Sequence, residues 1–128
     1  MEMSLNKEKN KTILIVDDEA LVRTYLRDLL EEHGYRVCLA PDCKDVMRIF
    51  DIVKIDLVLT DIVMPDCDGF ELIKALKGKV PIIAMTGRSH GDVYLKTARL
   101  MGVTTLAKPF QSSTVLETIA KIFANECD

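Results

Sequence analysis

Acidic side chains end or follow two apolar segments of the sequence, and a lysine follows a third. Asp17 and Asp18 come after the segment TILIV, Asp61 after LVLT and Lys108 after TTLA. Clustered carboxylates repel one another unless a cation lies among them, and a small open site of oxygen ligands suits Mg²⁺. A carboxylate can also attack phosphorus to give an aspartyl phosphate. These residue types therefore point to magnesium-dependent phosphoryl chemistry, provided that the fold brings them together.

Asp61 is the central residue of this set. A carboxylate at the tip of a buried strand loses solvent at a high cost unless something pairs with it. A phosphoryl group transferred to it would need positive charge and hydrogen-bond donors around its oxygens. Lys108 and Mg²⁺ would supply the charge, and the hydroxyl of Thr86, at the end of the segment PIIAMT, would supply a donor.

The elements that must position these residues follow from an alternation of short apolar and amphipathic segments. The predicted strands span residues 12–16, 36–40, 57–60, 81–86 and 104–107, and their nearly continuous hydrophobicity suits a sheet covered on both faces. Strict alternation with helices implies parallel strands joined by right-handed crossovers. The sequence therefore predicts an α/β fold with a doubly wound (βα)5 sheet.

The predicted helices carry apolar residues three and four positions apart. These residues are Leu21, Val22, Tyr25, Leu26, Leu29 and Leu30 in the first helix, Val46, Ile49, Phe50 and Val53 in the second, Phe70, Ile73 and Leu76, followed by the amphipathic Lys77, in the third, Val93, Ala98 and Met101 in the fourth, and Val115, Leu116, Ile119, Ile122 and Phe123 in the fifth. The pair His33-Gly34 is expected to end the first helix with a glycine cap.

Ligand sites of doubly wound sheets lie outside the carboxyl ends of the strands, where every residue of the set is predicted to lie. Each residue also has a plainer interpretation. An acidic turn such as Asp17-Asp18-Glu19 can simply cap a helix, Thr86 can be an ordinary strand-end hydroxyl, and Lys108 can be a solvated loop lysine. Together these interpretations fail, because chance would have to place each polar group at the same end of four strands.

Composition narrows the class of protein further. The 128 residues suit one domain, which we place at residues 11–128 after a polar leader at 1–10. Lys and Arg number 17 against 20 Asp and Glu, for a net charge of −3, so no overall positive field would gather nucleic acid or an anionic membrane. No apolar run approaches the length of a membrane span, and nothing resembles a signal peptide. The composition predicts a cytoplasmic protein.

Four cysteines stand at positions that carry no recognisable framework. Cys38, Cys43, Cys67 and Cys127 show no C-x-x-C spacing. In a reducing cytoplasm such residues are expected to be buried or incidental thiols. The sequence therefore predicts neither a disulfide nor a metal site built from cysteine.

Four segments, in order and spacing, carry a family resemblance. ILIVDDE, LVLTDIVMPDCDGFELI, PIIAMTG and KPF resemble the receiver domain of two-component response regulators, of the chemotaxis-response-regulator kind, from about Lys11 to Asn125. The resemblance implies a flavodoxin-like three-layer sandwich with a parallel sheet of strand order 2-1-3-4-5. It also implies a signalling domain, not an enzyme acting on a separate substrate.

The resemblance assigns the acidic residues to a metal and a nucleophile. Asp17 and Asp18 correspond to the acidic pair that holds Mg²⁺, for which Mn²⁺ is a substitute. Asp61 corresponds to the phospho-acceptor and a further metal ligand. The backbone carbonyl of Val63 completes the implied ligand set.

The remaining motifs imply a switch. Thr86, followed by Gly87, corresponds to the switch hydroxyl, and Lys108 to the lysine that pairs with the phosphoryl group, with a cis bond to Pro109. In the family a sensor histidine kinase or phosphotransfer protein supplies the phosphoryl group. The domain catalyses its own phosphorylation and slow autodephosphorylation, and the face formed by the fourth helix, fifth strand and fifth helix then signals to a downstream protein or output domain. The implied assembly is a monomer or a phosphorylation-dependent dimer.

Three positions differ from, or vary within, the family pattern. Thr105 stands where many receivers carry an aromatic residue, so we expect a readout without aromatic gating. Val63 and Arg88 border the expected path of the water that attacks the aspartyl phosphate. Val63 cannot orient that water and Arg88 can cover the phosphoryl oxygens, which predicts a long-lived phosphorylated state. Decay after removal of the phosphodonor would test this expectation.

Two other functions share parts of the pattern. A haloacid-dehalogenase-like phosphatase uses an aspartate nucleophile with Mg²⁺, but its nucleophile ends the first strand in a D-x-D pattern, where this chain has adjacent Asp17 and Asp18. A flavodoxin-like FMN carrier needs a neutral hydroxyl and glycine loop at the same place to hold phosphate. The acidic turn of this chain would repel that phosphate, which disfavours the FMN carrier. The missing D-x-D pattern disfavours the phosphatase.

Overall fold

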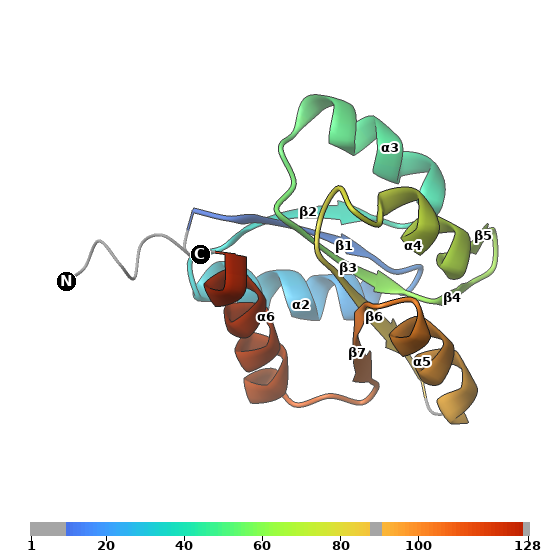
Figure 1. The fold of residues 1–128 in the computed structure, drawn as a ribbon. Helices are drawn as coiled ribbons and strands as arrows, with labels where there is room; N and C mark the ends of the chain where they lie inside the picture. Colours follow the sequence, from blue (N-terminus) through green and yellow to red (C-terminus); the bar gives the residue numbers. More distant parts are fainter. Residues whose placement is uncertain (1–9, 88–90, 127–128) are drawn as a thin grey trace.

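The computed structural model describes residues 10–87 and 91–126, and the leader predicted at 1–10 lies almost wholly outside the described residues. Its elements in chain order are β1 (Thr12–Val16), α2 (Ala20–Glu32), β2 (Arg36–Ala40), α3 (Cys43–Ile52), β3 (Leu57–Asp61), β4 (Val63–Met64), β5 (Cys67–Asp68), α4 (Gly69–Leu76), β6 (Ile82–Thr86), α5 (Gly91–Leu100), β7 (Thr104–Ala107) and α6 (Ser112–Glu126). Figure 1 shows the five long strands side by side with helices around them.

Five of these strands form one parallel sheet of order β2-β1-β3-β6-β7. When only the five strands of this sheet are numbered along the chain, the order is 2-1-3-4-5, so the predicted doubly wound, flavodoxin-like fold is confirmed. From β1 the chain first adds β2 on one side of the sheet and then β3, β6 and β7 on the other, so the strand order reverses between β1 and β3. This switch point places the carboxyl ends of β1 and β3 beside each other at one edge of the sheet.

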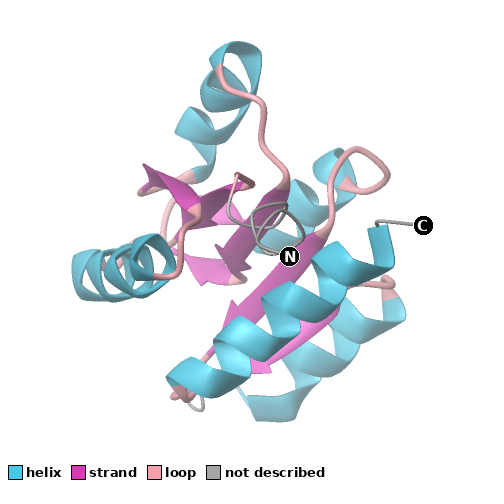
Figure 2. Ribbon diagram, turned by 90° about the vertical axis from the view of Figure 1, so that its left-hand side faces the viewer, coloured by secondary structure: helices cyan, strands magenta, loops and turns pink. Residues whose placement is uncertain are grey.

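Helices cover both faces of the sheet because successive strand residues point to opposite sides. Leu14, Val16 and Val58 pack in one cluster with side chains of α3, α4 and α5. Ile13 and Ile15 pack in a second cluster with side chains of α2 and α6. Figure 2 shows this three-layer arrangement with the strands between the helices. In the described parts of the chain, no helix is long and apolar enough to cross a bilayer.

The sequence overestimated burial in three places. The edge strands β2 and β7 are only partly buried, because a strand with one neighbour is less completely covered. On α2, Leu26 and Leu30 are fully buried, whereas Leu21 is 86% and Tyr25 46% exposed. Val93 of α5 is exposed as well. Helical spacing identified the right segments but made the apolar stripe too wide, since it cannot show how much of a helix its neighbours cover.

Local signals explain where the helices begin and end. Asp42 caps α3 by accepting from the backbone N–H groups of Lys44 and Asp45, and Asp68 caps α4 by accepting from that of Phe70. At the end of α2, Gly34 adopts a positive φ of 92°, which confirms the predicted glycine cap.

A small antiparallel hairpin, β4–β5, follows β3 and was not predicted. Val63 pairs with Asp68 and Met64 with Cys67. The hairpin returns the chain to Gly69, whose N–H donates to the carbonyl of Ile62 at 3.1 Å. A Cβ at Gly69 would overlap the backbone of Ile62, so this close approach requires glycine.

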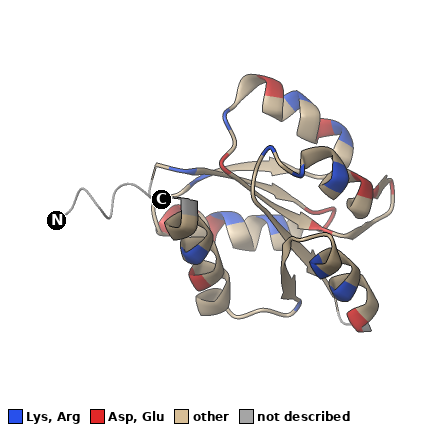
Figure 3. Cartoon of the chain, in the orientation of Figure 1, with Lys and Arg blue, Asp and Glu red and all other residues tan. Residues whose placement is uncertain are grey.

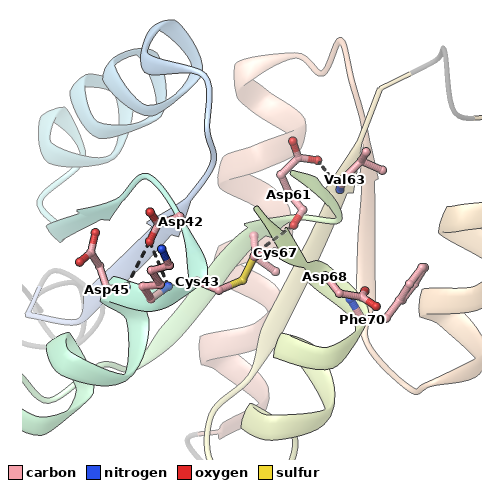
Figure 4. The surroundings of a disulfide bond; sticks show 10 residues. Asp42, Cys43, Asp45, Asp61, Val63, Cys67, Asp68 and Phe70 are labelled. Carbon is pink, nitrogen blue, oxygen red and sulfur yellow. Dashed lines mark hydrogen bonds between the residues drawn. A yellow bond between two sulfur atoms is a disulfide. The ribbon is translucent and has the colours of Figure 1, made fainter. Parts of the chain in front are cut away.

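The prediction of free thiols was wrong for two cysteines. Cys43 and Cys67 form a disulfide with a Cα–Cα distance of 5.8 Å, drawn in Figure 4, whereas Cys38 is free as expected. The sequence could not reveal the bridge, because the two residues are 24 positions apart and only the fold brings α3 against the β4–β5 hairpin. Cys127 lies outside the described residues.

We predict that Gly69→Ala destabilises the protein by about 2–3 kcal/mol, because a methyl group meets the Ile62 backbone and the hairpin must move. Gly78→Ala is the control. There a Cβ meets nothing within 4 Å, and only the positive φ of 88° opposes it, at a cost of about 1–2 kcal/mol. Urea unfolding of both variants is the measurement, and a loss at Gly69 no larger than at Gly78 would contradict the assigned contact.

Candidate functional site

Asp17 is the most enclosed carboxylate of the site. It follows β1 directly, is 0% exposed, and its backbone N–H donates to the carbonyl of Ala40 at the end of β2. Its Oδ1 accepts from the N–H of Glu19 at 2.9 Å, and its carbonyl accepts from the Arg23 guanidinium. These bonds fix both the backbone and the side chain of Asp17.

Asp61 ends β3 and is held more loosely. It is 5% exposed, and its Oδ1 accepts from the N–H of Val63 at 3.4 Å, a long hydrogen bond. Figure 4 shows the Asp61 carboxylate turned toward Val63 at the start of the β4–β5 hairpin. The nearly inaccessible carboxylate therefore keeps lone pairs that no strong donor occupies.

Lys108 joins the two carboxylates from the loop after β7. Its Nζ lies 2.9 Å from Asp17 Oδ2, 3.4 Å from Asp61 Oδ2 and 3.6 Å from Glu19 Oε1. Burial lowers the pKa of Lys108, but the hydrogen bond and charge of Asp17 and the charge of Asp61 outweigh it and raise the pKa above its ordinary value. The ammonium is therefore kept charged where it faces the carboxylates.

Burial dominates the electrostatics of Asp61. Loss of solvent raises its pKa, and the charge of Asp17 raises it further. Lys108 and the N–H of Val63 lower the pKa without cancelling the increase, so it stays above its ordinary value. The Asp61 carboxylate is thus a less stabilised anion than an exposed aspartate, which favours nucleophilic attack.

The predicted carboxylates do converge. One ligand oxygen each of Asp17, Asp18 and Asp61 lies within 4.8 Å of the others, with Asp18 exposed and the other two buried. An open, all-oxygen set of this size fits Mg²⁺, which keeps several waters when bound by a few carboxylates. Lys108 alone cannot neutralise three carboxylates, which is a second reason why the residues present suit a divalent cation.

Thr86 ends β6 beside this cluster. It is 1% exposed, and among the described residues its hydroxyl has no hydrogen-bond partner. Its carbonyl accepts from the N–H of Lys108 at 2.8 Å. A buried hydroxyl without a partner is uncommon, and it indicates a site shaped for an additional polar group.

Three of the predicted site residues line a hollow of the surface. Gly87, Lys108 and Pro109 line a hollow of about 550 Å³ together with Leu21, Val22, Tyr25 and Phe110. The Lys108-Pro109 bond is cis, which confirms that expectation.

Three further residues concern the predicted site: Thr105, Arg88 and Arg23. Thr105 lies on β7 opposite Ala84 of β6, and its Oγ1 accepts from Arg99 Nε of α5 at 3.2 Å. Arg88 lies outside the described residues. The contact of Arg23 with the Asp17 carbonyl could not be predicted, since an arginine six residues after a strand-end aspartate is not a motif and the contact needs the turn between β1 and α2.

The sequence and fold match known proteins. Residues 13–120 match the family model described as response regulator receiver domain, and the chain therefore belongs to that family. It is 30% identical over 115 residues to sporulation initiation phosphotransferase F of Bacillus subtilis (strain 168), covering 88% of this chain and 93% of that protein. It is also 35% identical over 112 residues to transcriptional regulatory protein FixJ of Bradyrhizobium diazoefficiens, covering 84% of this chain and 54% of FixJ.

Solved structures agree with this assignment. A two-component response regulator from Clostridium difficile superposes with a TM-score of 0.84 at 25% identity, covering 93% of this chain and 100% of that one. Full-length FixJ from B. japonicum gives a TM-score of 0.78 at 29% identity, covering 90% of this chain and 58% of that one. The chain spans about half the length of several curated relatives, which are transcriptional regulatory proteins.

We predict that Asp61→Asn raises the free energy of unfolding at pH 7 in metal-free buffer, on the order of 1 kcal/mol, since it removes a desolvated charge. The folded-state pKa of Asp61 is raised, so the cost of its charge is present above that pKa. The advantage of the variant should shrink as pH falls through it toward about 4.

Urea unfolding at pH 7 and pH 4 tests this prediction, with Lys108→Met as the matched variant. That change leaves two buried carboxylates without their ammonium, so it should destabilise the protein at pH 7. Equal stability of wild type and Asp61→Asn at pH 7 would refute the assigned cost.

Proposed function

We propose that this receiver domain accepts a phosphoryl group on Asp61 and that the change in charge there switches a signalling face. The observation that carries the proposal is the loosely held Asp61 carboxylate, with the Lys108 ammonium at 3.4 Å. At the end of the adjacent strand lies the Thr86 hydroxyl, which has no hydrogen-bond partner among the residues that the structure describes. Nucleophile, cation and donor are the parts that phosphoryl transfer to a carboxylate requires.

The reaction follows from these parts. A carboxylate oxygen of Asp61 attacks phosphorus, the P–O bond forms, and the bond to the donor breaks. When the donor is a phosphohistidine, the P–N bond breaks and the imidazole nitrogen keeps the electron pair. Lys108 then pairs with a phosphoryl oxygen, and the Thr86 hydroxyl donates to another, which gives that hydroxyl a partner that residues 10–87 and 91–126 do not supply.

Asp17, Asp18 and Asp61 would hold the Mg²⁺ of this reaction, and Val63 would add its backbone carbonyl. The bound ion would neutralise charge on the phosphoryl oxygens. Asp17 contributes most to orientation, because its backbone is fixed by Ala40 and Arg23.

The face that changes would be α5–β7–α6. Thr86 pairs with Ala107 of β7, and the backbone N–H of Lys108 binds the Thr86 carbonyl, so movement of Thr86 acts directly on β7. Because Thr105 replaces an aromatic residue, the hydrogen bond from Arg99 to Thr105 is the link through which β7 would act on α5. Full reversal of a 1:99 equilibrium needs about 5.5 kcal/mol of differential interaction, a scale that a dianionic group with several new charge-assisted bonds can reach.

The proposed phosphodonor is a sensor histidine kinase or a phosphotransfer protein. It would reach Asp61 across the hollow beside Lys108, where the exposed Leu21 and Tyr25 offer apolar contacts. The output would be a protein contact, because acidic and basic residues lie side by side on α3, α5 and α6 in Figure 3 and form no basic stripe there for nucleic acid. We propose a cytoplasmic location and a monomer, or a dimer formed on phosphorylation.

We predict that acetyl phosphate with Mg²⁺ adds one phosphoryl group to the protein, and that Asp61→Asn or EDTA abolishes the addition. Intact-protein mass spectrometry measures it. Asp66→Asn is the control, since Asp66 is an exposed carboxylate in the same loop and should label like the wild type. Undiminished labelling of Asp61→Asn would overturn the proposed function.

We also predict that Asp18→Ala weakens Mg²⁺ binding about tenfold or more, because one of three carboxylates is lost. In metal-free buffer the same variant should unfold at the same or a slightly higher urea concentration, since repulsion is relieved. Calorimetric titration with MgCl₂ is the measurement, with Asp66→Ala as the control. Unchanged affinity in Asp18→Ala would remove this residue from the metal site.

A further inference from the structure

The Cys43–Cys67 disulfide joins the two segments that flank the acidic cluster. Cys43 is the first residue of α3, which follows β2, and the carbonyl of Ala40 at the end of β2 accepts from the N–H of Asp17. Cys67 belongs to β5, which pairs with the strand that holds Val63. The bridge therefore links the segment after β2, which bonds Asp17 through Ala40, to the hairpin beside Asp61. Figure 4 shows the bridge between Cys43 and Cys67, with Asp61 and Val63 nearby.

The hairpin depends on an external tether. Each of its strands has two residues, and an isolated hairpin of this size is not stable in water. Besides the disulfide, it is held by the hydrogen bond from Gly69 to Ile62, by the hydrogen bond from the N–H of Ile62 to the carbonyl of Met85 on β6, and by the burial of Ile62 and Met64. Since Val63 donates to Asp61 Oδ1, the position of the hairpin sets the position of one of the two donors to this carboxylate among the described residues.

The two sulfur atoms are placed for selective, reversible chemistry. Cys43 and Cys67 are both half-buried, not sealed in the core, and they lie within one chain at a Cα–Cα distance typical of disulfides. By contrast, burial raises the pKa of the free Cys38, which keeps it in the unreactive thiol form. Disulfides of reducing compartments are usually transient or redox-sensing, which matches a pair that can be opened.

We propose that Cys43 and Cys67 are a redox modification site, oxidised by a peroxide and reopened by a dithiol, whose disulfide holds the β4–β5 hairpin in place for phosphorylation of Asp61. The effect of the disulfide on phosphorylation rests on the proposed function of Asp61. The hairpin is preorganised in the oxidised state and free to move away from Asp61 in the reduced state, so oxidation speeds phosphoryl transfer.

The oxidation balances with hydrogen peroxide as the acceptor of two electrons. Each thiol first gives up its proton to become a thiolate. One thiolate attacks a peroxide oxygen, the O–O bond breaks, a sulfenic acid forms, and the departing hydroxide takes up one of these protons to become water. The second thiolate attacks the sulfenic sulfur, the S–S bond forms, the S–O bond breaks, and the departing hydroxide takes up the other proton as a second water. In the reverse direction a dithiol attacks the disulfide, becomes oxidised itself and returns both protein sulfurs to thiols.

The test uses the full chain with Cys38→Ser and Cys127→Ser, which leaves only the pair. After hydrogen peroxide, thiol titration under denaturing conditions should fall from two per chain to none, and dithiothreitol under native conditions should restore both. Two thiols remaining after peroxide would overturn the proposal. A bridge that dithiothreitol opens only in denaturant would overturn it as well, since the disulfide would then be a permanent staple.

Coupling to the site is measured in two independent ways. Amide hydrogen exchange of residues 62–68 should be slower in the oxidised state, and acetyl phosphate should label oxidised protein about threefold or more faster than reduced protein. Cys43→Ser in the same background should label at the reduced rate with or without peroxide, and Cys38→Ser alone should respond like the wild type.

The outcomes separate this proposal from the proposed function. Equal exchange and equal labelling rates in the two redox states would overturn the coupling. Absence of labelling in both states would refute phosphorylation of Asp61, while the thiol count and hydrogen exchange would still decide whether the bridge is reversible and whether it orders the hairpin. The melting temperature should also fall by about 5 °C or more on reduction, as expected for opening a loop across 24 residues.

Discussion

Two carboxylates are buried at one edge of the sheet, and the rest of the structure depends on how the free-energy cost of their burial is compensated. Asp17 and Asp61 are both nearly inaccessible, and the Lys108 ammonium that compensates them comes from the loop after the last strand. Charges in a low-dielectric surrounding interact strongly, so this lysine constrains where β7 can end relative to β1 and β3. The strand order of the parallel sheet must therefore bring the end of β7 close enough for Lys108 to balance the charges of Asp17 and Asp61.

The site divides its polar bonds unequally, and its reactivity follows from that division. Within the described part of the chain, Asp17 receives short bonds from Lys108 and Glu19, whereas Asp61 receives only long ones and the Thr86 hydroxyl has no partner. Asp17 is therefore a structural anion that fixes Lys108. Asp61 and Thr86 are left with unused capacity for a group that arrives later.

The strands and the converging residues could be predicted because their information is local. Continuous apolar runs mark buried parallel strands, and parallel strands necessarily bring their carboxyl ends to one edge, so Asp17, Asp61, Thr86 and Lys108 followed from four separate strand ends. The Cys43–Cys67 bridge and the β4–β5 hairpin could not be predicted, since both depend on how α3 docks near the turn after β3. The exposure of Leu21 escaped prediction for a related reason, because periodicity defines a face but not what covers it.

The bridge from Lys108 to Asp17 spans 91 positions in the sequence. During synthesis Asp17 leaves the ribosome long before Lys108, and until β7 has docked the two central carboxylates lack their ammonium. Mutual repulsion between the two carboxylates opposes closing this edge of the sheet until β7 is in place. The last strand therefore brings the charge with which the first and third strands can close, and a chain truncated before Lys108 would leave that edge uncompensated.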